Sequence, residues 1–500
     1  MKNNFSKSIF YSYGSIVFTS LIGFITLPLS LNYFGKDLFG LFSITSDTLA
    51  YFALFNFGIP WAAATIFAKL HSYQAQKSLL LKSLKLLMVL SVAIASIVYA
   101  VGLCFPDWVN FIALVSPHIT PLARLFISIS VIFFIIRLPF SLFGQLLIFI
   151  NRVYISKIID VLSSALAITC LLLVIHFKLT IVQYAIISGF ISLVPLFLSV
   201  VIFIKIWRKN SSLNLGYENE NISYRHLMGS SFYFFLNGIG GLIILNTDSL
   251  VISHYLGLGE TAEYAVMFKF FTMLFMIITQ VMNVLNPLYP KFLKEGKFDL
   301  LVKLFDVVAR IFPIIGGFIF ILMFGFFKDF VILWTHNSTI FIGYLSCFAM
   351  GLYCYFLCSS AIPYWVLVSL NYSKEIYKLT LLEAIVNLVL SIYLVNKIGI
   401  AGVVFGTLIA HVLTMFILVP IKLDRLIPNL FKFDFTYVFK HLVFAILPVS
   451  IMIYLLNGYS LNLIKALCFI AVCIFYFVVS FIVVGKRNLI EARQLIKVLR

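Results

Sequence analysis

The chain has 500 residues, of which 62% are hydrophobic and only 11% are charged, and its mean hydropathy is +1.09. This composition excludes an ordinary soluble domain and indicates a polytopic α-helical membrane protein. A net charge of +18 would suggest a nucleic-acid partner in a soluble protein. Here the Lys and Arg residues lie in short loops beside apolar segments, so we expect no nucleic-acid partner.

Fourteen apolar segments are predicted to cross the membrane, each close to the ~20 residues that a helix needs to span ~30 Å of hydrocarbon. They lie at 10-34, 39-67, 86-105, 122-150, 153-176, 180-204, 229-256, 262-288, 307-327, 343-370, 377-395, 400-421, 441-457 and 462-485. The first is too long for a signal-peptide core and lacks a small-residue cleavage site, so we expect it to stay as a membrane helix. The predicted fold class is all-α.

Positive charge alternates between successive loops. Counted alternately from the N-terminus, one side carries 28 basic residues, and the other carries five, which are Lys36, Arg124, Lys178, Lys328 and Lys397. Because Lys and Arg are enriched in cytoplasmic loops, this asymmetry predicts that both termini are cytoplasmic. Three basic residues remain within spans: Arg137, Lys269 and Lys465. Of these, Lys465 lies at the start of the last span and could reach the outer surface.

The polar segment from Lys205 to Met228 divides six spans from eight. The end of the first span reads LNYFGKDLFGLFSI and the end of the seventh reads SHYLGLGETAEYAV. Six spans separate these similar turns, so a repeat would be parallel; the alternative is that aromatic-Gly ends are simply common at membrane surfaces. We predict an N-terminal lobe at 1-205, a cytoplasmic linker at 206-228, a C-terminal lobe at 229-426, and two additional spans with a cytoplasmic tail at 427-500.

No motif of an enzyme or metal site stands out. All seven cysteines fall within predicted spans, and no His or carboxylate beside Cys354 and Cys358 completes a ligand set. Neither half contains a Gly-rich phosphate loop or a G-x-S-x-G turn, and the longest predicted outer loops, near 106-121 and 328-342, have about sixteen residues. We therefore expect no enzymatic activity, no disulfide and no metal site.

Ionisable side chains within the spans cost ~2.5–3.5 kcal/mol each to insert, so they are expected to face a bundle interior or a wet cavity. The acids and the histidine are Asp47, Asp160, Asp248, Glu383 and His411, and the bases are Arg137 and Lys269. Asn283 shares a helix face with Lys269, and Asn237 shares one with Asp248. Such polar stripes predict a common cavity. Alternatively, the polar groups join neighbouring helices, and Asp160 or Asp248 pairs with Lys269 or Arg137.

Asp47 and Glu383 lie near the middle of their spans with no obvious local cation. Desolvation favours the neutral form of a carboxyl group, so either could carry a coupling proton. His411 could do the same, although a lone histidine is more often a packed, hydrogen-bonded residue. A coupling proton or sodium ion is the only cofactor we expect.

The segments LNYFGKDLFGLFSI, FALFNFGIPWAAATIFAKL, NTDSLVISHYLGLGETAEYAV and, at 396-413, NKIGIAGVVFGTLIAHVL are together similar to the polysaccharide (O-antigen, Wzx-type) flippases of the MATE-like, or MOP, exporter superfamily. The resemblance covers most of the chain, and the order and spacing of the segments carry it. It implies a two-lobed transporter in the bacterial inner membrane. Such a protein moves an undecaprenyl-pyrophosphate-linked oligosaccharide from the cytoplasmic to the outer leaflet by alternating access. Asp248 lies in one of the matching segments.

A diphosphate headgroup requires cations whose own burial is offset when the ligand binds. Arg137 and Lys269, one in each predicted lobe, are the best candidates, with Asn237 and Asn283 as further cavity residues. Membrane lipids and other polysaccharide-assembly proteins are the remaining expected partners.

Three alternatives stay open. A MATE-like drug or cation exporter would have a cavity dominated by acids, whereas this chain places Arg137 and Lys269 within spans. A peptidoglycan lipid-precursor flippase shares the superfamily and the number of spans. A polytopic polysaccharide polymerase or glycosyltransferase would need a long outer loop bearing catalytic residues, and the sequence shows no such loop.

Overall fold

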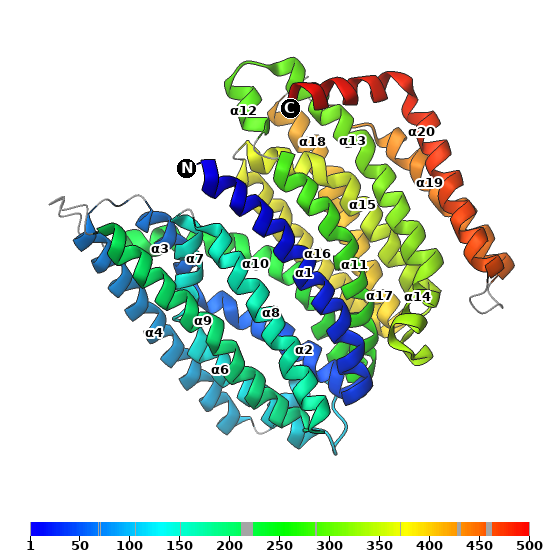
Figure 1. Cartoon of the computed structure of the whole chain (residues 1–500). Helices are drawn as coiled ribbons and strands as arrows, with labels where there is room; N and C mark the ends of the chain where they lie inside the picture. Colours follow the sequence, from blue (N-terminus) through cyan, green and yellow to red (C-terminus); the bar gives the residue numbers. More distant parts are fainter. Residues whose placement is uncertain are drawn as a thin grey trace. The chain divides into compact units, whose positions relative to one another are not determined.

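The computed structural model in Figure 1 describes the backbone of residues 2–499 apart from 69, 71, 106, 151, 212–223, 286–287, 371, 428–431 and 457–462. The side chains of 2–10, 484–499 and a scatter of other residues, most of them between 210 and 291, also lie outside this description. All regular structure in the described part is helical, which confirms the predicted fold class. Two compact units are distinguished: an N-terminal unit of 1–242 and 256–262, and a C-terminal unit of 243–255 and 263–500.

Twelve helical stretches of the described residues are long and apolar enough to cross a membrane. They coincide one by one with twelve of the predicted spans. The other two predicted spans, 229-256 and 262-288, coincide with the helices α10 (Tyr224–Tyr255) and α11 (Leu258–Leu285), which are not among the twelve. The chain is thus a multi-pass membrane protein, and the number of fourteen spans stays a prediction.

The helices before the 212–223 segment belong to the N-terminal unit. They are α1 (Lys2–Phe34), α2 (Lys36–Ala53), the 3-10 turn η1 (Leu54–Asn56), α3 (Ile59–Phe67), α4 (Tyr73–Cys104), α5 (Trp108–Ile112), α6 (Thr120–Arg137), α7 (Ser141–Phe149), α8 (Val153–His176) and α9 (Ile181–Ser211). Helix α1 packs on α8, and α9 packs on both α6 and α8. Buried residues of α3, α4, α7 and α9, such as Leu79, Leu142 and Phe203, form a shared hydrophobic core.

The second predicted span, 39-67, is not one continuous helix. After η1, Phe57 and Gly58 adopt left-handed backbone conformations with φ of 50° and 71°. The Asn56 side chain stabilises this break, because its Oδ1 accepts a hydrogen bond of 2.8 Å from the Gly58 N–H. Pro60 then lies in the first turn of α3, where a missing N–H costs no hydrogen bond.

The fourth predicted span, 122-150, is also broken, between α6 and α7 at Leu138–Phe140. Pro139 lies at the centre of the break, and the Ser141 hydroxyl donates a hydrogen bond of 2.7 Å to the Leu138 carbonyl. Irregular backbone at membrane depth must be buried in protein or line a cavity. The break makes Arg137 the last residue of α6.

The helices after α11 belong to the C-terminal unit. They are α12 (Leu288–Lys294), α13 (Phe298–Ile321), the π-helical turn η2 (Leu322–Phe326), α14 (Phe327–Thr335), η3 (Ser338–Ile340), α15 (Tyr344–Ser369), α16 (Ser373–Ile398), α17 (Ile400–His411), the π-helical turn η4 (Val412–Phe416), α18 (Ile417–Leu426), α19 (Phe435–Leu456) and α20 (Leu463–Leu499). Helix α15 is largely buried and packs on α13 and α17, so its side chains form much of the core of this unit.

Helices α16 and α17 form a tight hairpin whose turn is Gly399, with a φ of 60° that favours glycine. A Cβ on Gly406 would lie 2.6 Å from Ser391 Oγ, and a Cβ on Gly402 would overlap the Leu394 carbonyl. These glycines therefore let the two helix backbones touch. The hairpin places the polar residues of α16 directly against those of α17.

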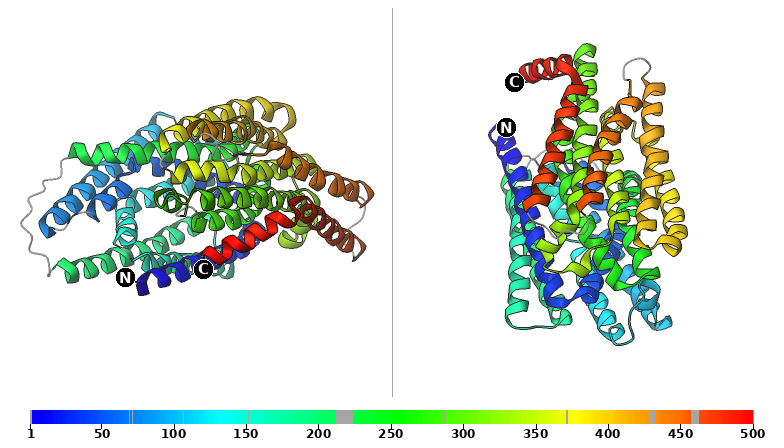
Figure 2. Two further views of the ribbon diagram at one scale, coloured as in Figure 1. Left: turned by 90° about the horizontal axis from the view of Figure 1, so that it is seen from above. Right: turned by 90° about the vertical axis from the view of Figure 1, so that its right-hand side faces the viewer.

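The last two helices, α19 and α20, pack on α13 and on each other (Figure 2). The Tyr476 hydroxyl of α20 donates a hydrogen bond of 3.1 Å to the Ile314 carbonyl of α13. The expectation that Lys465 reaches the surface is wrong. Its side chain is buried and pairs with Asp329 of α14, with 2.7 Å between Nζ and Oδ2, because the start of α20 lies against a helix that supplies a carboxylate.

Candidate ion and headgroup sites

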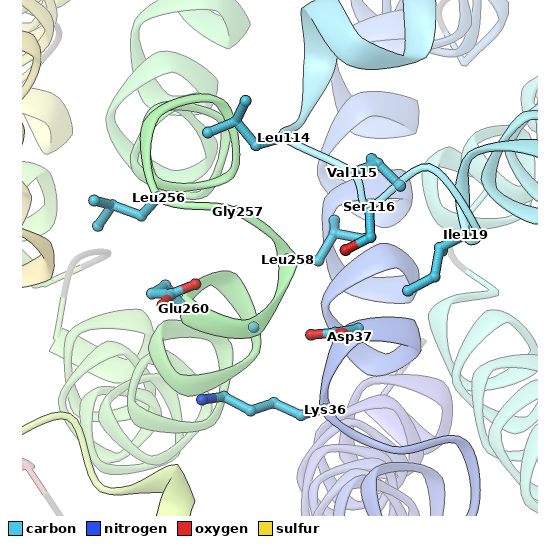
Figure 3. Close-up of a pocket in the computed structure, with 11 residues that line it drawn as sticks. Lys36, Asp37, Leu114, Val115, Ser116, Ile119, Leu256, Gly257, Leu258 and Glu260 are labelled. Carbon is cyan, nitrogen blue, oxygen red and sulfur yellow. The ribbon is translucent and has the colours of Figure 1, made fainter.

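A cavity of about 430 Å³ opens in the N-terminal unit between the start of α2, the 114–119 segment and the 256–260 turn. Figure 3 shows Lys36, Asp37 and Ser116 reaching toward this turn, which also carries Glu260. The two similar turns found in the sequence meet here, since a Cβ on Gly40 would overlap the Leu258 backbone. Charged and hydroxyl groups thus lie together where the sequence predicts outer loops.

Arg137 lines a second cavity of the N-terminal unit, of about 260 Å³, between α2, α6, α8 and α9. Hydroxyl groups from three of these helices line the same cavity: Thr45, Ser46, Ser130, Tyr184, Ser188 and Ser192. No carboxylate among the described residues pairs with Arg137. A guanidinium beside several hydroxyls can bind an oxyanion through charge-assisted hydrogen bonds.

Lys269 lies half-buried on α11 in the C-terminal unit, and within the described part of the chain it also has no acidic partner. Asp160 forms a partly exposed ion pair with Lys157, one turn earlier on α8, at 2.8 Å. The buried Asp248 is hydrogen-bonded by neutral hydroxyl groups. Among the described residues, neither Asp160 nor Asp248 pairs with Lys269 or Arg137.

Asp248 of α10 is at the centre of an oxygen-rich cluster in the C-terminal unit. Its Oδ2 accepts hydrogen bonds from the Tyr264 hydroxyl at 3.1 Å and the Thr407 hydroxyl at 2.8 Å. The Oδ1 of Asn387, on α16, lies 3.2 Å from Thr407 Oγ1. Asp248 Oδ1 and Asn387 Nδ2 are buried and have no hydrogen-bond partner among the described residues. A cluster with one carboxyl group and several further side-chain oxygens can hold a positive ion.

Glu383 and His411 form a second cluster, in which the carboxyl group of α16 meets the imidazole of α17. Glu383 Oε1 lies 2.7 Å from His411 Nδ1, and both residues are only 3% exposed. On the other side of the ring, Ser360 Oγ of α15 lies 3.0 Å from His411 Nε2. The Tyr353 ring meets the imidazole edge-on, with 5.4 Å between ring centroids. Three helices therefore meet at one titratable pair.

The positions of these polar residues along the chain indicate the two clusters, although the helical period within one helix does not. Glu383 and His411 are equidistant in sequence from Lys397, at the hairpin turn, and so are Asn387 and Thr407. An antiparallel helix pair brings such mirrored positions together. Polar residues at spacing i, i+4 on both arms therefore indicate a polar seam between α16 and α17 once the hairpin is assumed.

The remaining predicted site residues are placed less fully. Asp47 lies half-buried on α2. Asn237 and Asn283 fall on α10 and α11, but their side chains lie outside the described part of the structure. The roles of these three residues stay predictions.

Comparison with known proteins identifies the family. The family model described as "Polysaccharide biosynthesis protein" matches residues 5–294, more than half of the chain. The chain belongs to this family. The membership inferred from the sequence motifs is thereby confirmed.

Two relatives illustrate the range of similarity of this polysaccharide biosynthesis protein. It is 28% identical over 201 residues to the putative O-antigen transporter of Salmonella typhimurium, a match that covers 39% of this chain and 45% of that protein. It is 21% identical over 412 residues to the uncharacterized membrane protein EpsK of Bacillus subtilis, covering 80% and 79% of the two chains. The chain thus spans less than half the length of the O-antigen transporter but most of the second relative.

Solved structures show the fold of this family member. The lipid II flippase MurJ in an inward closed conformation superposes with a TM-score of 0.67 at 17% identity, covering 94% of this chain and 98% of that one. An inward-facing multidrug resistance MATE family transporter of the MOP superfamily superposes with a TM-score of 0.59 at 13% identity, covering 83% and 95%. The chain therefore has the same fold as these two proteins.

Proposed function

We propose that this protein is a flippase that moves an undecaprenyl-pyrophosphate-linked oligosaccharide from the cytoplasmic to the outer leaflet of the bacterial inner membrane by alternating access, with both of its termini in the cytoplasm. The family supports a role in polysaccharide biosynthesis, and the name of the Salmonella relative supports transport. The observation that carries the choice of substrate is the pair of cations, Arg137 and Lys269, that the described residues leave without an acidic partner.

An unpaired cation at membrane depth is costly, and an anionic ligand offsets that cost when it binds. Arg137 suits bidentate contact with a phosphate, and the hydroxyls beside it supply further hydrogen bonds. Lys269 supplies a flexible point charge. A diphosphate supplies the negative charge that either cation requires, whereas a cationic drug would be repelled by each of them. This argues against the drug or cation exporter alternative.

Transport against a gradient needs a coupling ion, which we propose is a proton or a sodium ion. The candidate groups are the buried acids, of which Asp248 and Glu383 lie in polar clusters of the C-terminal unit. No catalytic step is part of the proposal, because the substrate crosses the membrane unchanged.

The test uses the purified full chain in lipid vesicles and two fluorescent probes with the same diphosphate headgroup chemistry. One probe is an undecaprenyl-pyrophosphate-linked oligosaccharide and the other is the lipid-linked peptidoglycan precursor. We expect protein-dependent exchange of the first probe between leaflets, measured by the fraction accessible to an impermeant quencher. Transport of only the peptidoglycan precursor would replace the proposal by that alternative, and transport of neither would refute a flippase. In cells, depletion of the protein should abolish surface polysaccharide while membrane integrity is retained.

A further inference from the structure

We infer that Glu383 and His411 together form one proton-binding site, and that this site couples transport to a proton. The inference rests on the proposed flippase function and specifies its driving ion. The Glu383–His411 pair is buried, joins α16 to α17, and has a third helix, α15, hydrogen-bonded to it through Ser360.

The hydrogen bonds around the imidazole suit both of its protonation states. Because an ionised carboxylate can only accept, His411 Nδ1 carries a proton while Glu383 is charged. When Nε2 is unprotonated, the Ser360 hydroxyl can donate to it across 3.0 Å. When Nε2 gains a proton, the same hydroxyl can accept from it and turn its own proton to the Leu357 carbonyl, 3.3 Å away. Proton uptake therefore leaves no buried polar atom of this set unpaired.

The protonation state changes the net charge that the pair carries in the membrane. With a neutral imidazole the pair bears one uncompensated negative charge, and with an imidazolium it is a neutral ion pair. A buried uncompensated charge is far more costly than a hydrogen-bonded ion pair. Proton binding therefore favours states in which the site is closed off from water. A transporter passes through such a closed state when it turns the site from one side of the membrane to the other.

Titratable groups of α15 and α10 lie near the pair. Helix α15 presents the tyrosines 353 and 364 near Glu383, and Asp248 of α10 lies within electrostatic range of Tyr353. The thiol of Cys354, also on α15, lies near Tyr353. Among the described residues, no Lys or Arg pairs with Glu383 or His411.

The position of His411 gives protonation a route to the backbone. His411 is the last residue of α17, and the π-helical turn Val412–Phe416 begins at the next residue. π-helical turns inside α-helices are frequent at functional sites and mark places where the hydrogen-bond register can change. A change in charge at His411 therefore acts at the junction between α17 and α18.

The test measures the flipping rate of the fluorescent undecaprenyl-pyrophosphate-linked oligosaccharide with and without an imposed gradient of one pH unit. If one proton moves per cycle, this gradient corresponds to about a tenfold change in the ratio of forward to reverse rates. We expect the native protein to show this response. Glu383→Gln and His411→Gln should lose this response, which is measured in each variant as the ratio of the flipping rates with and without the gradient. Ser360→Ala should keep the response but shift the pH of its midpoint, since one protonation state loses its hydrogen bond.

The matched control is His441→Gln. His441 is another buried histidine of the C-terminal unit, on α19, and its Nδ1 lies 2.9 Å from the Tyr437 carbonyl. This variant should retain the full gradient response. Full responses in well-folded Glu383→Gln and His411→Gln proteins would overturn the proton site.

The two levels of the proposal can fail separately. Native protein that exchanges the probe but ignores the pH gradient would overturn the proton site and leave the flippase standing. Native protein that does not exchange the probe at all would overturn both. If Glu383→Gln does not fold, His411→Gln and Ser360→Ala decide the question. In both variants the Glu383 carboxylate keeps a neighbour that can form a hydrogen bond with it.

Discussion

Replacement of Arg137 or Lys269 by alanine should abolish most export while the protein is made and inserted normally. The described residues give neither cation an acidic partner, so alanine leaves no buried carboxylate unpaired. Breaking a buried ion pair would cost about 3–5 kcal/mol of stability. That penalty should be absent here, and protein amounts should match those of the native chain.

The effect on the ligand follows from the bonds that are lost. A hydrogen bond to a charged group contributes about 1.5–3 kcal/mol, so losing one such bond to the diphosphate should weaken binding about 10- to 150-fold. Lys269→Arg retains the charge and should retain part of the export. Lys157→Ala is the matched control, because it removes a basic residue whose partly exposed pair with Asp160 contributes only about 0–1 kcal/mol.

Surface-polysaccharide blots beside membrane-fraction immunoblots measure both quantities in the same cells. Well-expressed Arg137→Ala and Lys269→Ala proteins with full export would refute the headgroup site. Poor insertion of either variant, recovered by a second substitution of an acid, would instead show that the cation is a structural partner.

Three further predictions concern stability and topology. Lys465→Ala should lower the free energy of unfolding by about 3–5 kcal/mol, and the double change Lys465→Met with Asp329→Leu should recover most of that loss. Thermal unfolding in detergent measures both variants. A Lys465→Ala protein as stable as the native chain would contradict the buried pair. Gly406→Val should push Ser391 of α16 away from α17 and lower the free energy of unfolding by about 1–3 kcal/mol. Export should fall as well, so a stable, active variant would show that the hairpin has room for the larger side chain. An alkaline-phosphatase fusion after residue 215 should be inactive and a fluorescent C-terminal fusion bright, whereas the reverse result would invalidate the orientation taken from the loop charges.

The positions of the membrane helices were predictable because the hydrocarbon core demands apolar segments of a set length. Twelve of the predicted segments are candidate spans among the described residues, at the same places in the chain. The breaks at Phe57–Gly58 and at Pro139 were not predicted, although their residues were visible. Glycine and proline are common in membrane helices that merely bend, so the decision between a bend and a break depends on packing and on partners such as Asn56 Oδ1.

The amino-acid sequence is enough to predict which side chains lie on membrane-spanning helices and which of them share a helix face. Both follow from apolar length and from the 3.6-residue period, which relate positions within one helix. The partners of these side chains, Glu383 with His411 and Asp329 with Lys465, are visible only in the folded chain. Those pairings join different helices, and the period of one helix carries no information about which neighbour it touches. Contacts such as the close approach at Gly406 settle that choice.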